Sequence, residues 1–133
     1  MKTLTIITLT IILLLSINSG IAQSYKVAKA SVPNYYKALN SDNHGVVESA
    51  IENLVKLKLF APDLDYSKVA EKLDQLTEDG QTIQIKYKAF VANLYLESPE
   101  KFNWLSSEDK DKQAKLFDTM FAQLEIRAKN RAQ

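Results

Sequence analysis

The sequence contains no cysteine, one histidine, three glycines and three prolines among its 133 residues. The absence of cysteine excludes a disulfide bond, a thiolate nucleophile, a cysteine-ligated zinc site and a cysteine-ligated iron–sulfur cluster. A single histidine excludes a site built from several imidazole groups. The formal net charge of +1 gives no electrostatic reason to expect a nucleic acid or an anionic membrane as a partner.

Residues 1–22 are predicted to form a secretory signal peptide. Lys2 precedes the apolar stretch Leu4–Ile17, and Gly20-Ile21-Ala22 gives the small-x-small pattern of a cleavage site. An uncleaved anchor is the alternative, but the apolar stretch is shorter than the roughly 20 residues that span a bilayer. We therefore expect an exported protein, periplasmic or secreted, with no stable membrane anchor after cleavage.

The rest of the chain has the composition of an ordinary globular domain. Lys2 is the only charged residue before Gln23, so residues 23–133 carry equal numbers of basic and acidic groups. A chain of this length buries a core without disulfides or metals. We expect residues 23–32 to be a polar lead-in and residues 33–133 to form a single domain.

Apolar residues recur at three- and four-residue spacing along that domain, which predicts an all-α fold. Glycine and proline fall between the apolar stretches and separate the elements. The expected helices run from Pro33 to Leu39, from Val46 to Phe60, between Asp65 and Gly80, from a Thr82 cap to about Glu97, and over residues 106–131.

Four expected helices have clear apolar faces. The face of the helix between Asp65 and Gly80, with Asp65 as its expected cap, comprises Val69, Leu73 and Leu76. The face of the helix from Val46 comprises Val47, Ala50, Ile51, Leu54 and Leu57. The helix after Thr82 is apolar around much of its circumference and should be central; its main side comprises Ile83, Tyr87, Phe90, Val91 and Leu94, and a strand over Thr82–Tyr87 is the alternative. The last helix, capped by Ser106 or Ser107, should bury Leu116, Phe117, Met120, Phe121, Leu124 and Ala128.

A weak internal repeat organises the middle of the chain. Leu39, Asp42 and Pro62 are matched 37 residues later by Leu76, Asp79 and Pro99. Each unit consists of a helix, an Asp-containing turn with a glycine, a longer helix and a proline. Self-similarity at such a period indicates stacked antiparallel helical hairpins. We expect about two units over residues 33–99, capped by the long C-terminal helix.

These units resemble HEAT repeats. Leu76-Thr77-Glu78-Asp79-Gly80 followed by Ile85-Lys86-Tyr87-Lys88-Ala89 is similar to the family's Asp-containing turn and the start of its second helix. Asp42 followed by Val46-Val47-Glu48-Ser49-Ala50 is the counterpart in the first unit. Lys86 and Val47 stand where arginine is usual. Tetratricopeptide repeats are the rival, on Asp65–Ala70 and Pro99, but their period of about 34 fits less well.

The resemblance implies a partner-binding surface along the second helices of the hairpins. The residues it selects form a mixed-charge strip: Glu48, Glu52, Lys56, Gln84, Lys86 and Lys88. Trp104, in a connector with Phe102 after Pro99, is a further candidate as an exposed anchor. A solvated helix face for the strip, and packing beneath the last helix for Trp104, are the alternatives.

No catalytic, cofactor-binding or metal-ligating residue is assigned. The sequence lacks the common hydrolase, zinc-protease, phosphate-loop and dinucleotide motifs. His44 is interpreted as a polar turn residue. Asp63, Asp65 and Ser67 copy the start of a calcium loop, but Lys68 stands where that loop needs glycine. Glu97 and Glu100, the candidate pair for glycosidase chemistry, flank Pro99 at a helix end, where solvation accounts for them.

Two classes of function follow. The leading hypothesis is an exported, non-catalytic helical-repeat module that binds a protein or peptide partner and no nucleic acid. The alternative is a small exported ligand-binding protein or hydrolase that uses an aromatic-lined cavity. Self-association is left open.

Overall fold

The computed structural model describes residues 23–104 and 115–131. The chain divides into two compact units, Met1–Ser31 and Val32–Gln133. The predicted signal peptide lies outside the described residues, and the division of the chain at residues 22 and 32 stays a prediction. The described part of the first unit, residues 23–31, is helical.

The first helix begins earlier than the sequence predicts. Helical backbone covers residues 23–39, so the segment predicted as a polar lead-in, residues 23–32, is helical and Pro33 lies inside the helix. Proline has no backbone N–H, so the carbonyl of Lys29 loses its usual helical partner. Lys29 and Ala30 before the proline, and Lys37 and Ala38 after it, are good helix formers and favour the helix on either side.

The described residues are all helix and loop, which confirms the all-α prediction. The elements of the second unit are α2 (His44–Phe60), α3 (Ser67–Asp79), α4 (Ile83–Glu97), the short 3₁₀ helix η1 (Pro99–Phe102) and α5 (Leu116–Arg131). The alternative strand over Thr82–Tyr87 is wrong, because this segment forms the start of α4. Within residues 23–104 and 115–131, no helix is both long and apolar enough to cross a membrane.

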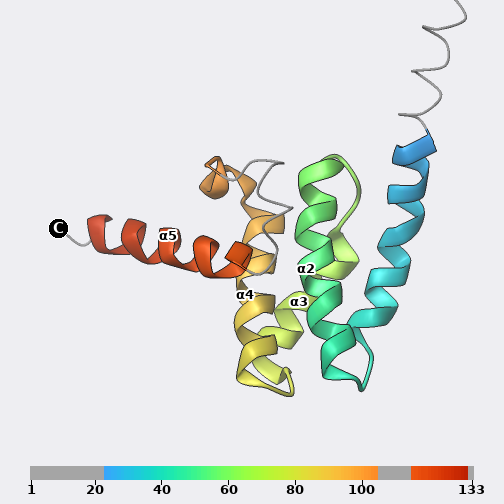
Figure 1. Cartoon of the computed structure of the whole chain (residues 1–133), viewed down its shortest axis with the longest axis horizontal. Helices are drawn as coiled ribbons and strands as arrows, with labels where there is room; N and C mark the ends of the chain where they lie inside the picture. The colour runs from blue at the N-terminus through green and yellow to red at the C-terminus, as the bar shows by residue number, and fades with distance from the viewer. Residues whose placement is uncertain (1–22, 105–114, 132–133) are drawn as a thin grey trace, which may run out of the picture. The chain divides into compact units, whose positions relative to one another are not determined.

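The helices of the second unit pack as hairpins, an arrangement compatible with a helical repeat. α3 and α4 run antiparallel, and α2 lies beside α4 and runs in the same direction (Figure 1). The turn before α2 and the turn before α4 therefore lie at the same end of the unit, the lower end in Figure 1.

α4 lies at the centre of the packing, as its apolar circumference predicts. It contacts α2, α3, η1 and α5. Its buried residues are Ile85, Ala89, Val91, Ala92, Asn93, Tyr95 and Leu96. The predicted main side is wrong in two positions, because Ile83 is 83% exposed and Phe90 is 48% exposed. α2 and α3 pack against the side of α4 that faces away from Ile83 and Phe90.

The apolar face of α2 is close to the prediction. Val47, Ala50, Ile51 and Leu54 are buried as expected, whereas Val55 takes the place of Leu57, which is only partly buried. Together with Val69 and Leu73 of α3, these side chains belong to the buried core. Burial of such side chains supplies most of the stabilisation, at about 1.5–3 kcal/mol for each large one.

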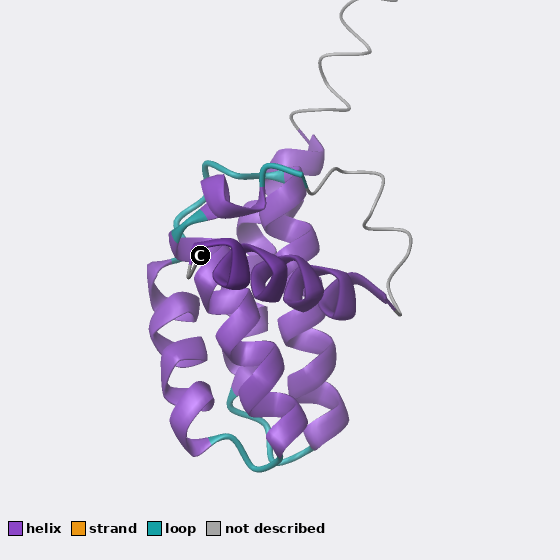
Figure 2. Cartoon of the chain, turned by 90° about the vertical axis from the view of Figure 1, so that its left-hand side faces the viewer, coloured by secondary structure: helices purple, strands orange, loops and turns teal. Residues whose placement is uncertain are grey.

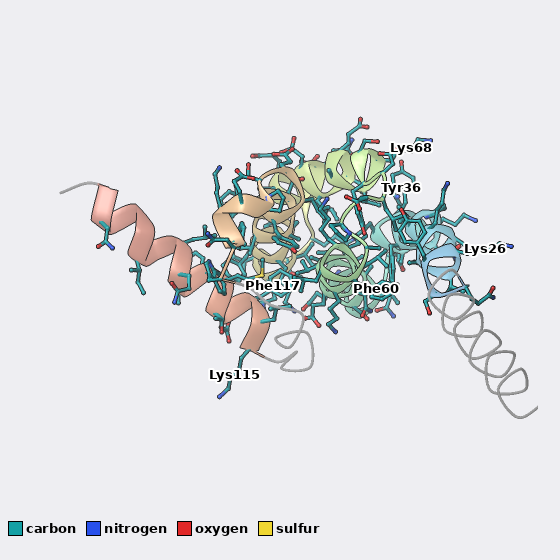
Figure 3. All side chains as sticks on the ribbon, turned by 90° about the horizontal axis from the view of Figure 1, so that it is seen from above. Lys26, Tyr36, Phe60, Lys68, Lys115 and Phe117 are labelled. Carbon is teal, nitrogen blue, oxygen red and sulfur yellow. The ribbon has the colours of Figure 1, made fainter. Side chains whose placement is uncertain are left out.

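α5 covers α4 less completely than the sequence predicts. It crosses the other helices at a steep angle (Figure 2). Leu116, Phe117 and Met120 are buried, but Phe121 is exposed and Leu124 is only partly buried. Figure 3 shows Phe117 against the other helices and Lys115 pointing away from them. The Ser106 or Ser107 cap and the side chain of Ala128 lie outside what the structure describes.

The loop residues cap the helices largely as expected. Thr82 Oγ1 accepts a hydrogen bond from the Ile85 N–H at 3.1 Å, and Asn43 Oδ1 accepts one from Val46 at 3.3 Å. Gly45, predicted in the turn, lies instead in the first turn of α2. Such caps satisfy backbone donors that a helix start leaves unpaired.

The α3 boundaries use a carboxylate and a glycine. Asp65 Oδ1 accepts hydrogen bonds from the backbone N–H and the hydroxyl of Ser67, which lower the pKa of that exposed carboxyl. Gly80 ends α3 with a φ of −55°, so the left-handed conformation common at helix ends is not used. Glycine is needed here because an added Cβ would lie 2.5 Å from the Leu76 carbonyl oxygen.

Candidate functional site

Three residues of the predicted mixed-charge strip form ion pairs with one another. Lys88 Nζ of α4 lies 2.7 Å from Glu48 Oε2 and 2.7 Å from Glu52 Oε1, both on α2. The Lys88 side chain is 12% exposed and each glutamate is 29% exposed. This triad lies across the α2–α4 contact, so its charged groups are directed at one another and not at solvent.

The triad also determines the protonation of its lysine. Burial disfavours the charged form of Lys88, but hydrogen bonds and attraction from Glu48 and Glu52 outweigh burial and raise the pKa of Lys88. The lysine is therefore charged throughout the neutral range. A poised, neutral lysine nucleophile would need the opposite shift.

The other strip residues are less constrained. Lys86 Nζ donates to the Glu78 carbonyl oxygen at 2.5 Å and so links α4 to the end of α3. Gln84 is exposed and Lys56 is partly buried. Three of the six strip residues thus form an internal ion triad and a fourth ties two helices together. This leaves Gln84 and Lys56 as the strip residues with no such contact within the described part of the chain.

Trp104 belongs to a group of aromatic rings beside α4. The Phe102 ring, itself buried, lies 5.4 Å from the Tyr95 ring and 6.1 Å from the Trp104 ring, measured between centroids. Trp104 Nε1 is buried and has no hydrogen-bond acceptor among the described residues. The indole is partly exposed, so it is packed on one side.

The sequence pattern does not predict that part of an apolar side of α4 is open: Ile83 and Phe90 are exposed, whereas Tyr87 and Leu94 are partly buried. Ile83, Tyr87, Phe90 and Leu94, spaced at i, i+4, i+7 and i+11, lie along one side of this helix; we call them the α4 ridge. α5 meets the ridge at Tyr87, whose ring lies 5.0 Å from that of Phe121 and whose hydroxyl donates to the Phe117 carbonyl at 3.3 Å. The sequence identified these residues as apolar but assigned them to the core.

A cavity of about 210 Å³ lies where the turns before α2 and α4 meet; we call it the inter-turn cavity. Its floor consists of Leu39, Val47 and Ile85, each at most 2% exposed. Its polar rim comprises Asn40, Ser41, Asp42, Lys72, Gln75, Asp79 and Gln81. No aromatic residue lines it.

Two more open hollows lie elsewhere on the second unit. One, of about 490 Å³, has Tyr66 as its aromatic lining residue, and the other, of about 360 Å³, has Tyr35. Each of these two hollows thus has one aromatic lining residue. Other aromatic rings, on α4 and α5 and around η1, pack against one another.

The remaining candidates for chemistry lie apart from one another. His44 is exposed at the first position of α2. The Asp65 carboxylate holds Ser67 at the start of α3, which is a structural use of two residues of the calcium-loop pattern. Among the residues that the structure describes, no group of three or more His, Asp or Glu side chains could hold a metal ion.

Comparison with protein-family models, with curated proteins and with solved structures finds no match for this chain.

Proposed function

We propose that this chain is an exported, non-catalytic interaction module, built from HEAT-like helical hairpins, which binds a protein partner by accepting one of its helices on the α4 ridge. The observation that carries the proposal is the exposure of Ile83 and Phe90, at 83% and 48%, on the helix at the centre of the packing. Contiguous exposed apolar side chains of this kind mark interaction surfaces.

The spacing of the ridge favours a helix as the occupant. In a stack of helical hairpins, each hairpin covers the apolar face of its neighbour. Here α5 crosses the ridge at Tyr87 and leaves Ile83 and Phe90 in contact with solvent. Ile83 and Phe90, two turns apart at i and i+7, are the apolar ridge residues that α5 leaves for a second helix to cover.

The charged residues take new roles in this proposal. Gln84 lies next to Ile83 and belongs to the rim of the ridge, where polar contacts give specificity. Lys56 and Trp104 stay candidates for contacts at the edge of the bound partner. Glu48, Glu52 and Lys88 are assigned to holding α2 against α4, because each is paired within the chain.

Site-specific photo-crosslinking tests the proposal. A photoreactive phenylalanine at position 90 should yield a discrete crosslinked partner, and Ile83→Glu should abolish that product. The matched control is position 60, because Phe60 is 53% exposed but lies on α2. The partner, once purified, should bind the wild-type chain and should bind Ile83→Glu at least tenfold more weakly. Equal background from positions 60 and 90 would refute the proposal.

Export is tested independently of binding. The signal-peptide prediction requires that the exported chain start at Gln23. Intact-mass measurement of the protein recovered outside the cytoplasm shows directly at which residue the chain begins. A product that retains residues 1–22 would support the uncleaved-anchor alternative.

Binding of a small ligand is the second candidate function, and the inter-turn cavity favours it. This cavity combines a buried apolar floor with converging polar side chains, the usual construction of a ligand site. It differs from the aromatic-lined site that the sequence predicts.

A further inference from the structure

The inter-turn cavity is formed by residues that the internal repeat relates. Leu39 and Leu76 are repeat counterparts, as are Asp42 and Asp79, and all four line the cavity. The parallel arrangement of α2 and α4 brings both turns to one end of the unit (Figure 1). The sequence repeat therefore supplies the two carboxylates of one site from two separate turns.

Five of the seven polar side chains of the rim have no hydrogen-bond or ion-pair partner within the described residues. Asp42, Lys72, Gln75, Asp79 and Gln81 make no side-chain hydrogen bond or ion pair within residues 23–104 and 115–131. The other two are engaged: Asn40 donates to the Tyr36 carbonyl, and Ser41 Oγ accepts from the Asn43 N–H. The free rim groups offer carboxylate and amide oxygens to an incoming donor.

The charges of the rim favour a cation. Two carboxylates, of Asp42 and Asp79, and one ammonium group, of Lys72, line the cavity, so its lining carries one net negative charge. The carboxyl ends of two helices and the amino ends of α2 and α4 surround the site, so the helix dipoles oppose one another and the side chains set the sign. Lys72 argues against a divalent metal, which prefers several carboxylates and no neighbouring lysine.

The volume and the floor limit the size of that cation. At about 210 Å³ the cavity is smaller than the roughly 300–1,000 Å³ of pockets that hold drug-sized ligands. Leu39, Val47 and Ile85 form an apolar floor that suits an aliphatic stem. A metal ion or a hydrated inorganic cation would leave this floor unused.

We propose that the inter-turn cavity binds an organic monocation, an alkylammonium or alkylguanidinium group, with its charge between Asp42 and Asp79 and its aliphatic stem on the floor. Gln75 and Gln81 accept the remaining N–H donors. The cation comes either from a free amine or from a lysine or arginine side chain of a peptide. This site lies apart from the α4 ridge, and the proposal does not depend on the function proposed for the ridge.

The test is a titration of the purified chain with butylammonium and with a blocked arginine, each followed by amide NMR shifts. Both probes carry the same chemistry, and they represent the free-amine and the peptide source respectively. We expect saturable shifts for Leu39, Asp42, Leu76 and Gln81. Neutral butanol, which has the same stem, and acetate are the control ligands.

Substitutions of the charged rim residues test whether the bound group is a cation. Asp42→Asn and Asp79→Asn should each weaken binding about fivefold or more, since each removes one attractive charge close to the cation. Lys72→Met should strengthen binding by a few-fold, because it removes a repulsive charge. Asp74→Asn, at an exposed α3 position that does not line the cavity, should leave binding unchanged.

The outcomes separate clearly. Tighter binding of the blocked arginine indicates a peptide side chain, and tighter binding of butylammonium indicates a free amine. Butanol binding as tightly as butylammonium, acetate binding more tightly, or an unchanged affinity in both aspartate variants would overturn the proposal. Circular dichroism of every variant checks that the helices are retained.

Discussion

Replacing Lys88 by methionine tests the α2–α4 ion triad most directly. Methionine keeps most of the aliphatic stem, so the change removes the ammonium group and little packing. The two 2.7 Å contacts to Glu48 and Glu52 are lost together. The two carboxylates, four residues apart on α2, then repel each other.

The structure brackets the cost of this change. Exposed ion pairs contribute about 0–1 kcal/mol, whereas breaking a buried pair costs about 3–5 kcal/mol. Lys88 is 12% exposed and its partners are 29% exposed, so the triad lies between these limits. We expect Lys88→Met to lower the free energy of unfolding by about 2–3 kcal/mol.

Urea denaturation followed by circular dichroism measures this loss, and Lys56→Met is the matched control. Lys56 is also a partly buried lysine of the predicted strip but makes no ion pair within the described residues. Its substitution should cost under about 0.5 kcal/mol. Glu48→Gln or Glu52→Gln should each cost about 1–2 kcal/mol, because one carboxylate still pairs with Lys88.

The result that refutes this reasoning is a Lys88→Met variant within about 0.5 kcal/mol of Lys56→Met. High salt gives a second check. A fully solvated triad would lose most of its contribution in 1 M NaCl, where the Debye length is about 3 Å, whereas a mostly buried lysine is screened much less.

Three further predictions concern the core and its titration. Gly80→Ala should destabilise the fold by about 1–3 kcal/mol in thermal unfolding, because its Cβ would meet the Leu76 carbonyl, whereas Gly45→Ala in the first turn of α2 should be neutral or stabilising. Asn93→Leu should stabilise by about 1 kcal/mol in urea titration, since the Asn93 Oδ1 is buried with no partner among the described residues, and a loss of stability would contradict this. Burial raises the pKa of Tyr87 and of Tyr95, with the charge of Asp118 adding to the rise for Tyr87, so their contribution to stability is full below pH 10 and is lost above it; a flat unfolding free energy between pH 9 and 12 would contradict this.

Local signals in the sequence predicted where most helices begin and end. Thr82 makes the capping hydrogen bond expected of it, and Pro62 and Pro99 follow the ends of α2 and α4. Asp65, whose side chain suits the cap of α3, lies one residue before the cap Tyr66 and accepts from Ser67 instead. These signals act over a few residues, so they can be read without knowledge of the packing. Pro33 misled because proline suits the first turn of a helix, while the segment before it is helical as well.

The side of α4 that faces the core could not be predicted in the same way. When apolar residues surround a helix, its sequence pattern does not say which side its neighbours cover. Ile83 and Phe90 are as apolar as Ile85 and Val91, yet only the latter two are buried. Which side is buried depends on where α2 and α3 pack, which the local pattern does not contain.

The candidate site shows the same limit. Lys88 has partners 36 and 40 residues earlier in the chain, a separation that periodicity within one helix cannot reveal. The repeat, by contrast, did contain the information for the inter-turn cavity, because it paired Asp42 with Asp79. The sequence alone does not show that the two repeated turns lie at the same end of the hairpin stack.

The way α5 meets the other helices sets an order for local unfolding. Its first two turns bury Leu116, Phe117 and Met120, whereas Phe121 and Ile126 are about half exposed. Segments with few buried contacts open at a lower free energy than the core around them. Amide hydrogens of residues 124–131 should therefore exchange long before those of α4, and a chain ending near residue 124 should retain the cooperative unfolding of α2, α3 and α4.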